Sequence, residues 1–292
     1  MDRLLVISPV RNEIAHIDRV VEAMAAQSRR PDVWVIVDDG SDDGTTERLR
    51  QRAADLRFIR LVEMPRQEPG VGDRLVAAAA PKAFNAGLAA AEDCQDGFVA
   101  KLDGDVELPE NWYAELLPRF DADPRLGIAG GDLIEPKRGD WKLLPIPQHH
   151  VHGALKLYRR ECFDQIGGVR ECLGWDTIDE TYARMHGWET RSFSDLVGQH
   201  HRPSGSAQGR LRGRARHGRC AYIAHFAPSW VLLRSLKIGL KSPPVLSAIA
   251  FVYGYVAAAV RRVPRVEDPE FRRFVRSELR GRLLSAIRLR PA

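Results

Sequence analysis

The chain has 292 residues, which is enough for one large domain or two smaller ones. Its 44% hydrophobic and 28% charged residues are typical of a globular protein and exclude a disordered, collagen-like or polytopic membrane chain. The four cysteines are widely spaced without a CxxC pair, which argues against a zinc ribbon or a disulfide framework and favours a reducing compartment. The first residues show no pattern of a secretory signal, so we expect a cytoplasmic protein.

The net charge of +5 conceals a division of the chain near residue 202. Residues 202–292 hold 19 Lys and Arg against 4 Asp and Glu, a net charge of +15, which leaves −10 for residues 1–201. We therefore predict an acidic domain over 1–201 and a basic, helical extension over 202–292. An extension of this charge is expected to meet an anionic partner, such as a membrane surface, phosphate groups or nucleic acid.

Strands and helices are predicted to alternate along the first two-thirds of the chain. The apolar runs that predict buried strands cover residues 4–8, 33–37, about 58–62, 97–102 and 127–130. The segments with helical spacing or helix-forming composition are 14–24 (after Asn12 as the N-cap), from about Thr45 onward, 77–92 and 109–120. Alternation of this kind predicts an α/β fold, with a mostly parallel sheet and helices on both faces.

Three polar clusters directly follow three of the predicted strands. They are Pro9–Glu13, Asp38–Ser41 and Asp103–Asp105. Because ligands of such sheets bind beyond the carboxyl ends of the strands, we expect the clusters to meet at one edge. Asp103-Gly104-Asp105 offers two carboxylates to Mg²⁺ or Mn²⁺, hard cations that take one or two protein carboxylates together with substrate phosphates. Taken alone, either acidic cluster is more typical of a polar turn than of a metal site.

The order and spacing of the clusters are more specific than any one of them. Residues 37–45, Val-Asp-Asp-Gly-Ser-Asp-Asp-Gly-Thr, with a DxD motif roughly 60 residues later, resemble the inverting GT-A glycosyltransferases of family 2. Ser8–Glu13 is similar to the first-strand motif of that family, and Phe84–Leu88 to its RN-x-G helix, with Phe84 in place of the usual Arg. The resemblance covers residues 3–201 and implies the Rossmann-like GT-A fold of transferases that use nucleotide-diphospho-sugars.

The resemblance also implies roles for the matching residues. The residues that would hold the donor nucleotide are Pro9, Arg11, Glu13, Asp39, Lys82, Asn85 and Asp103, with Arg216 on an arginine-rich loop over the diphosphate. Lys82 would replace the missing Arg of the RN-x-G helix. Mn²⁺ or Mg²⁺ would be bound by Asp105, Asp103 and His201, with His201 preferred to His200. Two alternatives stay open, namely that Pro9 only ends its strand and that Glu13 only serves a helix N-terminus.

An inverting transfer needs one carboxylate to deprotonate the acceptor hydroxyl as it attacks the anomeric carbon. The family supplies it from an Asp about 11 residues before a Gly-aromatic turn, and this spacing implies Asp176, with Trp175 where Glu is usual. Asp179 is the main alternative, followed by Glu180. The three acids share one face of a helix, so the two that are not the base would position it or bind the acceptor.

These motifs together predict a metal-dependent, inverting glycosyltransferase. It would move a sugar from a nucleoside-diphosphate sugar to a hydroxyl of a glycan or lipid-linked acceptor, in glycan or glycolipid assembly. One alternative is a nucleotidyltransferase that makes a nucleotide sugar, although the first strand is not followed by the Gly-rich phosphate loop typical of those enzymes. The other is a non-catalytic nucleic-acid-binding protein. It is disfavoured because the acidic domain would repel nucleic acid and because the basic segment lacks interleaved aromatic residues.

Residues 228–292 are predicted to attach to a membrane surface rather than to span it. The apolar run 245–260 has 16 residues, and a spanning helix needs about 20. Before it, Trp230 and several leucines lie among basic residues, a mixture that suits a helix in the plane of the interface. We therefore expect a peripheral protein at the inner face of the cell membrane. The alternative is a helical pair buried on the catalytic domain or in a homodimer.

Overall fold

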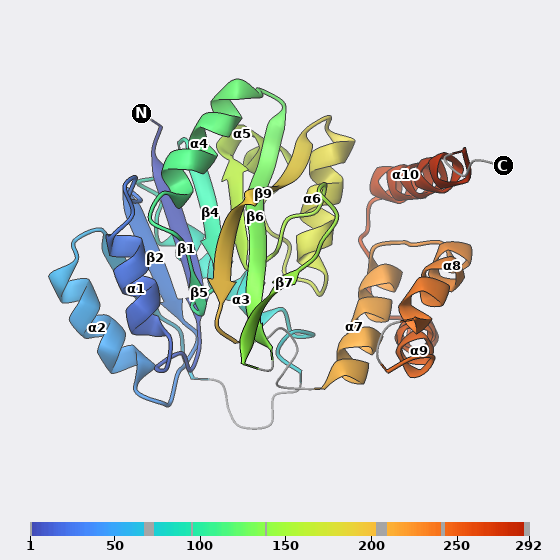
Figure 1. Ribbon diagram of the computed structural model, residues 1–292, viewed down its shortest axis with the longest axis horizontal. Helices are drawn as coiled ribbons and strands as arrows, with labels where there is room; N and C mark the ends of the chain where they lie inside the picture. Colours follow the sequence, from blue (N-terminus) through green and yellow to red (C-terminus); the bar gives the residue numbers. More distant parts are fainter. Residues whose placement is uncertain are drawn as a thin grey trace. The chain divides into compact units, whose positions relative to one another are not determined.

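The computed structural model describes residues 2–66, 73–94, 96–137, 139–202, 209–240 and 243–288, with only the backbone of 283–288 (Figure 1). The chain divides into two compact units, Met1–Ser204 and Gly205–Ala292. The boundary predicted from the charge lies between residues 201 and 202.

The described part of the first unit contains a nine-stranded sheet. Its parallel strands, in spatial order, are β3 (Ile59–Glu63), β2 (Val33–Asp38), β1 (Leu4–Val10) and β4 (Phe98–Leu102). The sheet continues through β8 (Leu155–Arg159), β6 (Leu126–Lys137), β9 (Glu189–His200) and β5 (Val106–Glu107), and β7 (Asp140–Leu144) forms a hairpin with β6. β8 runs antiparallel to both its neighbours, whereas β6 and β9 are parallel. The predicted α/β class with a mostly parallel, Rossmann-like sheet is confirmed.

Helices cover both faces of this sheet (Figure 1). They are α1 (Ile17–Ala25), α2 (Thr45–Asp55), α3 (Ala79–Ala89), α4 (Trp112–Ala122), α5 (Arg160–Gln165) and α6 (Trp175–Met185). Leu4 and Val6 of β1 belong to the same buried cluster as the apolar residues of α1 and α4. Ile7 faces the other way, against α3, where a side chain on Gly87 would collide with it. β1 is a continuous apolar run because neither of its faces meets water.

Asn12 is not the N-cap of the first helix, so that prediction is wrong. The residue that precedes α1 is His16, and Asn12 has a φ of 54°. The Asn12 side chain joins two loops instead: its Nδ2 donates to Asp42 Oδ1 at 2.8 Å, and its Oδ1 accepts from the Asp42 amide at 2.9 Å. These bonds hold the end of β1 against the loop after β2.

The described part of the second unit is helical, with α7 (Arg210–Ile223), α8 (Pro228–Gly239), α9 (Leu246–Val260) and α10 (Pro269–Arg288). α7 and α9 cross very closely, since a Cβ on Gly218 would lie 1.9 Å from the Phe251 carbonyl oxygen. A Cβ on Gly254 would lie as close to the Ala215 carbonyl oxygen. The buried cluster beside this crossing includes Tyr222, Val231 and Tyr255.

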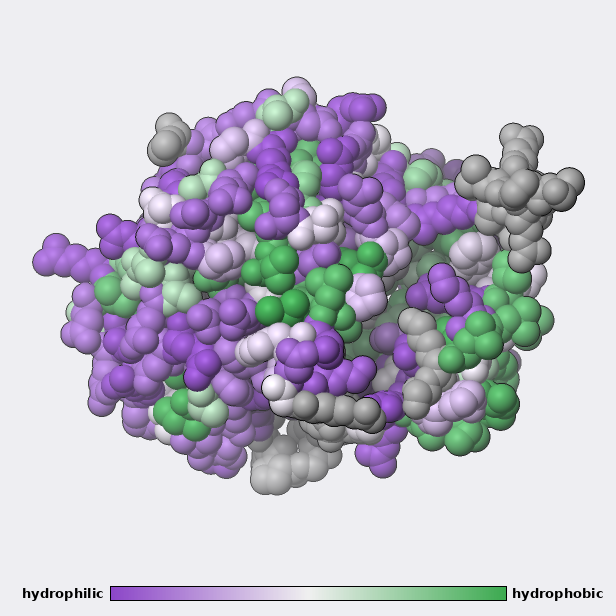
Figure 2. Space-filling view, in the orientation of Figure 1, coloured by the Kyte–Doolittle hydropathy of each residue, from purple (hydrophilic) through white to green (hydrophobic). Residues whose placement is uncertain are grey.

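Large apolar side chains of α8, α9 and the turn between them are exposed. They are Leu232, Leu233, Leu236, Leu240, Val245, Leu246, Ile249, Tyr253, Val256 and Val260. We call this set the α8–α9 apolar surface, and Figure 2 shows apolar residues gathered over this part of the molecule. Leu236 is 71% exposed and Val260 76%. Exposed large apolar side chains gathered in one place often mark an interaction site.

The close crossing predicts opposite effects for two glycines of α7. Gly218→Ala should destabilise the second unit by about 1–3 kcal/mol, because the new methyl group collides with the backbone of α9. Gly213→Ala is the matched control: its Cβ meets only the end of Arg216, at 3.9 Å. It should be neutral or stabilise the helix by up to about 1 kcal/mol. Urea unfolding followed by circular dichroism measures both changes, and equal stability of the two variants would contradict the crossing.

Candidate active site

The three polar clusters meet in one cleft, as predicted. Its volume is about 410 Å³, and it lies at the carboxyl ends of β1, β2 and β4. The lining residues are Pro9, Val10, Arg11, Asn12, Glu13, Asp39, Arg74, Leu75, Ala79, Ala80, Asp103, Gly104, Asp105 and Arg202. Six of the predicted donor or metal residues are therefore brought together.

The two neighbouring aspartates after β2 have different surroundings. Asp38 builds the turn, because its Oδ1 accepts from the Ser41 amide at 3.0 Å and from the Ser41 hydroxyl at 2.6 Å. Asp39 lines the cleft and is buried. Burial raises the pKa of Asp39 in spite of the opposing charges of Arg74 and Arg11.

Asp39 has one occupied and one unsatisfied carboxylate oxygen. Arg74 pairs with Oδ2, and Arg11 Nη1 donates to the backbone oxygen of Asp39 at 3.0 Å. Oδ1 is buried and has no hydrogen-bond partner among the described residues. A buried acceptor without a donor is costly, so this oxygen is suited to receive an N–H from a ligand in the cleft.

Glu13 and Asp105 form an acidic pair that Arg202 bridges. Arg202 Nη2 donates to Glu13 Oε2 at 2.6 Å, and its Nε lies 3.9 Å from Asp105 Oδ2. Burial and then the charge of Asp105 raise the pKa of Glu13 to about 8. The carboxylates of the cleft therefore repel one another, and a bound cation would reduce this repulsion.

The DxD turn packs tightly on the end of β1. A Cβ on Gly104 would lie 2.9 Å from Val10 Cγ2, so a larger residue would push the turn away. The Asp103 carboxylate pairs with Lys101, and Asp105 Oδ1 lies 3.4 Å from His200 Nε2. Two carboxylates on one turn fit Mg²⁺ or Mn²⁺, which take few protein ligands. The described residues hold no group of three or more His, Cys, Asp or Glu side chains in a metal-binding arrangement.

The predicted metal ligand His201 has other partners in this structure. Its Nε2 contacts Glu107 Oε2 at 2.8 Å, and its ring stacks on His16 and meets the edge of Trp141. His200 is the histidine beside Asp105, and its Nδ1 contacts Glu135 Oε1 at 3.0 Å.

Three predicted donor residues do not line the described part of the cleft. Lys82 is exposed on α3, and Asn85 Nδ2 donates to the Val169 carbonyl at 3.1 Å and to Glu171 Oε1 at 3.1 Å. Arg216 belongs to α7 of the second unit. The basic residues that do line the cleft are Arg11, Arg74 and Arg202.

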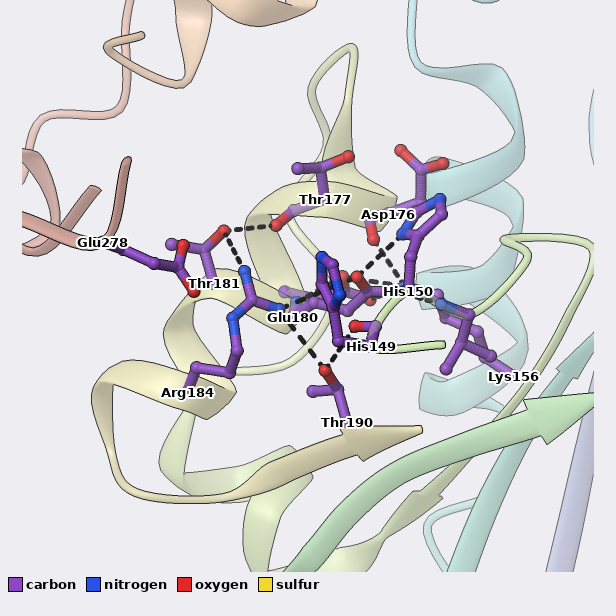
Figure 3. A network of polar contacts seen from close by, with 12 residues as sticks. His149, His150, Lys156, Asp176, Thr177, Glu180, Thr181, Arg184, Thr190 and Glu278 are labelled. Carbon is purple, nitrogen blue, oxygen red and sulfur yellow. Dashed lines mark hydrogen bonds and ion pairs between the residues drawn. The ribbon is translucent and has the colours of Figure 1, made fainter. Parts of the chain in front are cut away.

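The three acids of α6 fall into two classes, and Figure 3 shows one member of each, Asp176 and Glu180. Asp179 and Glu180 are buried beside the ammonium group of Lys156, each at 2.9 Å from Nζ. Tyr158 also donates to Asp179 Oδ2 at 2.6 Å. Burial works to raise the pKa of Glu180, but Lys156 and His150 hold it at about 2. Both carboxylates are therefore already paired with other side chains of the protein.

Asp176 lies in the first turn of α6 and is only partly buried. Lys156 Nζ donates to its backbone oxygen at 2.6 Å, which fixes the start of the helix. The Asp176 side chain packs beside Gly153, where a Cβ would lie 3.1 Å from that of Asp176. The Gly153 carbonyl accepts from Lys101 Nζ at 2.8 Å, and Lys101 is also the partner of Asp103. A short chain of contacts therefore joins Asp176 to the DxD turn.

Lys101 and Lys156 were missed because each lies within an apolar strand. They are directly opposite one another in the antiparallel pair of β4 and β8. Their ammonium groups lie 5.3 and 5.4 Å from the centre of the Trp175 ring. Arg74 and Arg202 were missed because isolated arginines in loops carry no spacing signal. Their place in the site is recognised only from the acids with which they pair, Asp39 and Glu13.

Asp179 is buried and Asp176 is only partly buried, so substitutions at the two positions should lower the stability of the protein by different amounts. Asp179→Asn should cost about 1–3 kcal/mol, because an amide has one acceptor oxygen where the buried carboxylate accepts from both Lys156 and Tyr158. Asp176→Asn should cost less than about 1 kcal/mol, since it removes only a favourable charge from a helix N-terminus. Guanidinium unfolding of both variants measures the difference, and equal losses would refute the separation.

Part of the sequence, and the fold, are similar to those of known proteins. Residues 5–147 match the pattern of glycosyl transferase family 2. Among solved structures, the chain is similar to the mannosyltransferase PcManGT from Pyrobaculum calidifontis in complex with GDP-Man and Mn²⁺, at 19% identity and a TM-score of 0.55. The similarity covers 99% of this chain and 80% of that one. A search of curated protein sequences finds no match. Residues 5–147 thus belong to glycosyl transferase family 2, and the chain is a glycosyltransferase with the GT-A fold.

Proposed function

We propose that the chain is a metal-dependent, inverting glycosyltransferase that moves a sugar from a nucleoside-diphosphate sugar to an acceptor hydroxyl. The observation that carries the proposal is the contact chain from Asp103 through Lys101 and Gly153 to Asp176. It holds a partly exposed carboxylate close to the cleft in which a nucleotide and a cation would bind.

The donor nucleotide would lie in the cleft, with its base and ribose at Pro9, Arg11, Glu13 and Asp39. The unsatisfied Asp39 Oδ1 supports this placement, because a nucleobase N–H would complete its hydrogen bonding. Arg74 and Arg202 would turn from their carboxylate partners toward the diphosphate. Neither was among our predicted residues, and they supply the charge that we expected from Lys82.

Mn²⁺ or Mg²⁺ would be held by Asp105 and Asp103, with the diphosphate oxygens completing its coordination. When bound, the ion would neutralise charge on the leaving diphosphate. The relative in complex with GDP-Man and Mn²⁺ supports a nucleotide sugar and a divalent ion as the ligands of this cleft. The His200 ring lies 3.4 Å from the Asp105 carboxylate, so we propose His200 rather than His201 as the histidine of the metal side.

Asp176 would act as the general base. It would take the proton of the acceptor hydroxyl while the hydroxyl oxygen bonds to the anomeric carbon from the face opposite the diphosphate. The bond between that carbon and the diphosphate oxygen would break, and the diphosphate would leave with the electron pair. Asp179 and Glu180 would position Asp176 through Lys156, because both are bound to its ammonium group.

We further propose that the second unit attaches the enzyme to an anionic membrane surface, where a glycan or lipid-linked acceptor is available. The α8–α9 apolar surface and the excess of basic residues in this unit support attachment. None of the helices in the described ranges combines the length and apolarity needed to cross a bilayer. A homodimer that buries the same surface is the alternative, and vesicle binding, described below, distinguishes the two.

The metal proposal predicts that Asp105→Asn lowers sugar transfer by about a hundredfold or more, because the ion loses its buried ligand. Wild-type activity should stop in excess chelator and return with Mn²⁺ or Mg²⁺. The control is Asp121→Asn on α4, which removes an exposed acid and should leave the activity unchanged. The assay screens nucleotide sugars and detects the released nucleoside diphosphate. Full activity in chelator would contradict the metal role, and release of pyrophosphate would indicate the nucleotidyltransferase instead.

The base proposal predicts that Asp176→Asn keeps the affinity for the donor but lowers transfer by about 10²–10⁴-fold. Calorimetry with the donor measures the first quantity, and product formation the second. NMR of the wild-type product should show an inverted anomeric configuration. Normal transfer by Asp176→Asn would mean that another group deprotonates the acceptor.

A further inference from the structure

The second unit contains an open cavity of about 750 Å³ that is rich in arginine. The residues that line it come from the end of α7, the segment after α9 and the first turns of α10. Its charged lining residues are Arg262, Arg265, Arg272, Arg273, Arg276, Glu267 and Asp268, together with His225. We call this cavity the arginine pocket.

The positive charge of the arginine pocket is poorly compensated. Arg273 is 3.4 Å from Glu270, but in the described ranges no carboxylate lies within ion-pair distance of the other four arginines. Asp268 is already engaged, since its Oδ1 accepts from the amides of Glu270 and Phe271. Burial, and then the charges of three of the arginines, lower the pKa of His225. Repulsion among these groups favours an anion in the pocket.

Arg265 provides a fixed donor in this pocket. Its guanidinium carbon lies 3.7 Å from the centre of the Tyr222 ring, so the side chain is held by stacking. Its Nε is buried and has no hydrogen-bond partner in the part of the chain that the structure describes. A planar guanidinium with an unpartnered N–H is suited to bind a phosphate oxygen.

A smaller, mostly apolar cleft adjoins the arginine pocket. Arg276 lines both, and Trp230, Leu233 and Leu279 line the smaller one. Leu233 also belongs to the α8–α9 apolar surface. A phosphate site that continues into an apolar cleft matches an amphiphile, with a charged head and a hydrocarbon tail, better than a free anion.

We propose that the arginine pocket binds the phosphate headgroup of an anionic membrane phospholipid, with an acyl chain along the Trp230 cleft. The proposal rests on the membrane attachment suggested above and deepens it. It assigns recognition of the headgroup to Arg265, Arg272 and Arg276, and insertion into the bilayer to the α8–α9 apolar surface.

The test is flotation of the full-length protein with vesicles of phosphatidylcholine alone and with added phosphatidic acid. The exposed pair Arg272→Gln with Arg276→Gln should lower binding to phosphatidic acid vesicles by about tenfold or more. The control, Arg210→Gln with Arg212→Gln, removes the same charge from exposed positions of α7 outside the pocket. It should lower binding by about twofold or less. Thermal unfolding checks that both double variants are folded.

The possible outcomes distinguish headgroup binding in the arginine pocket from membrane attachment of the second unit in general. Equal losses in the two double variants would contradict a headgroup site in the arginine pocket and would indicate attachment by the overall positive charge of the unit. No flotation of the wild-type protein would overturn both, while sugar transfer to a soluble acceptor would be unaffected. Millimolar inorganic phosphate should not displace the protein from vesicles. Displacement, together with saturable binding of inorganic phosphate by calorimetry, would identify the pocket as a site for a free anion and overturn the lipid assignment.

Discussion

Two buried ammonium groups face each other at the join between the parallel and antiparallel parts of the sheet. Lys101 and Lys156 are cross-strand partners, and like charges in that position repel. The arrangement is tolerated because each ammonium has its own acids, and because both lie close to the ring of Trp175. Lys101 orders the DxD side of the site and Lys156 orders the start of α6. The geometry of both sides of the site therefore depends on this pair of lysines and on the acids that neutralise them.

Two acids of the cleft are paired with arginines that also line it. Arg74 pairs with Asp39, and Arg202 with Glu13. In the proposed function, a diphosphate that enters this cleft would exchange partners with groups that are already in place, which would limit the cost of ordering them. The long, flexible side chains of the two arginines make such an exchange possible without movement of the strands.

The fold, and the edge of the sheet at which the site lies, could be predicted because both follow from regular patterns in the sequence. Buried strands leave apolar runs, and polar residues at the ends of parallel strands meet by topology. The spacing of acids on α6 could not decide among Asp176, Asp179 and Glu180, because all three lie on one helical face and only tertiary packing determines which are buried. Asn12 resembled an N-cap by residue type, yet its amide joins two loops that are far apart in the sequence. The two lysines were hidden for a related reason: a charged residue in an apolar run signals a buried ion pair only when its partner is known.

Trp175 stands where the family resemblance implies a glutamate. A carboxylate there would add a negative charge beside the two ammonium groups, whereas the indole ring attracts them through its π face and brings no charge. Changes at positions 101, 156 and 175 are therefore non-additive, since the cost of each depends on the residues at the other two.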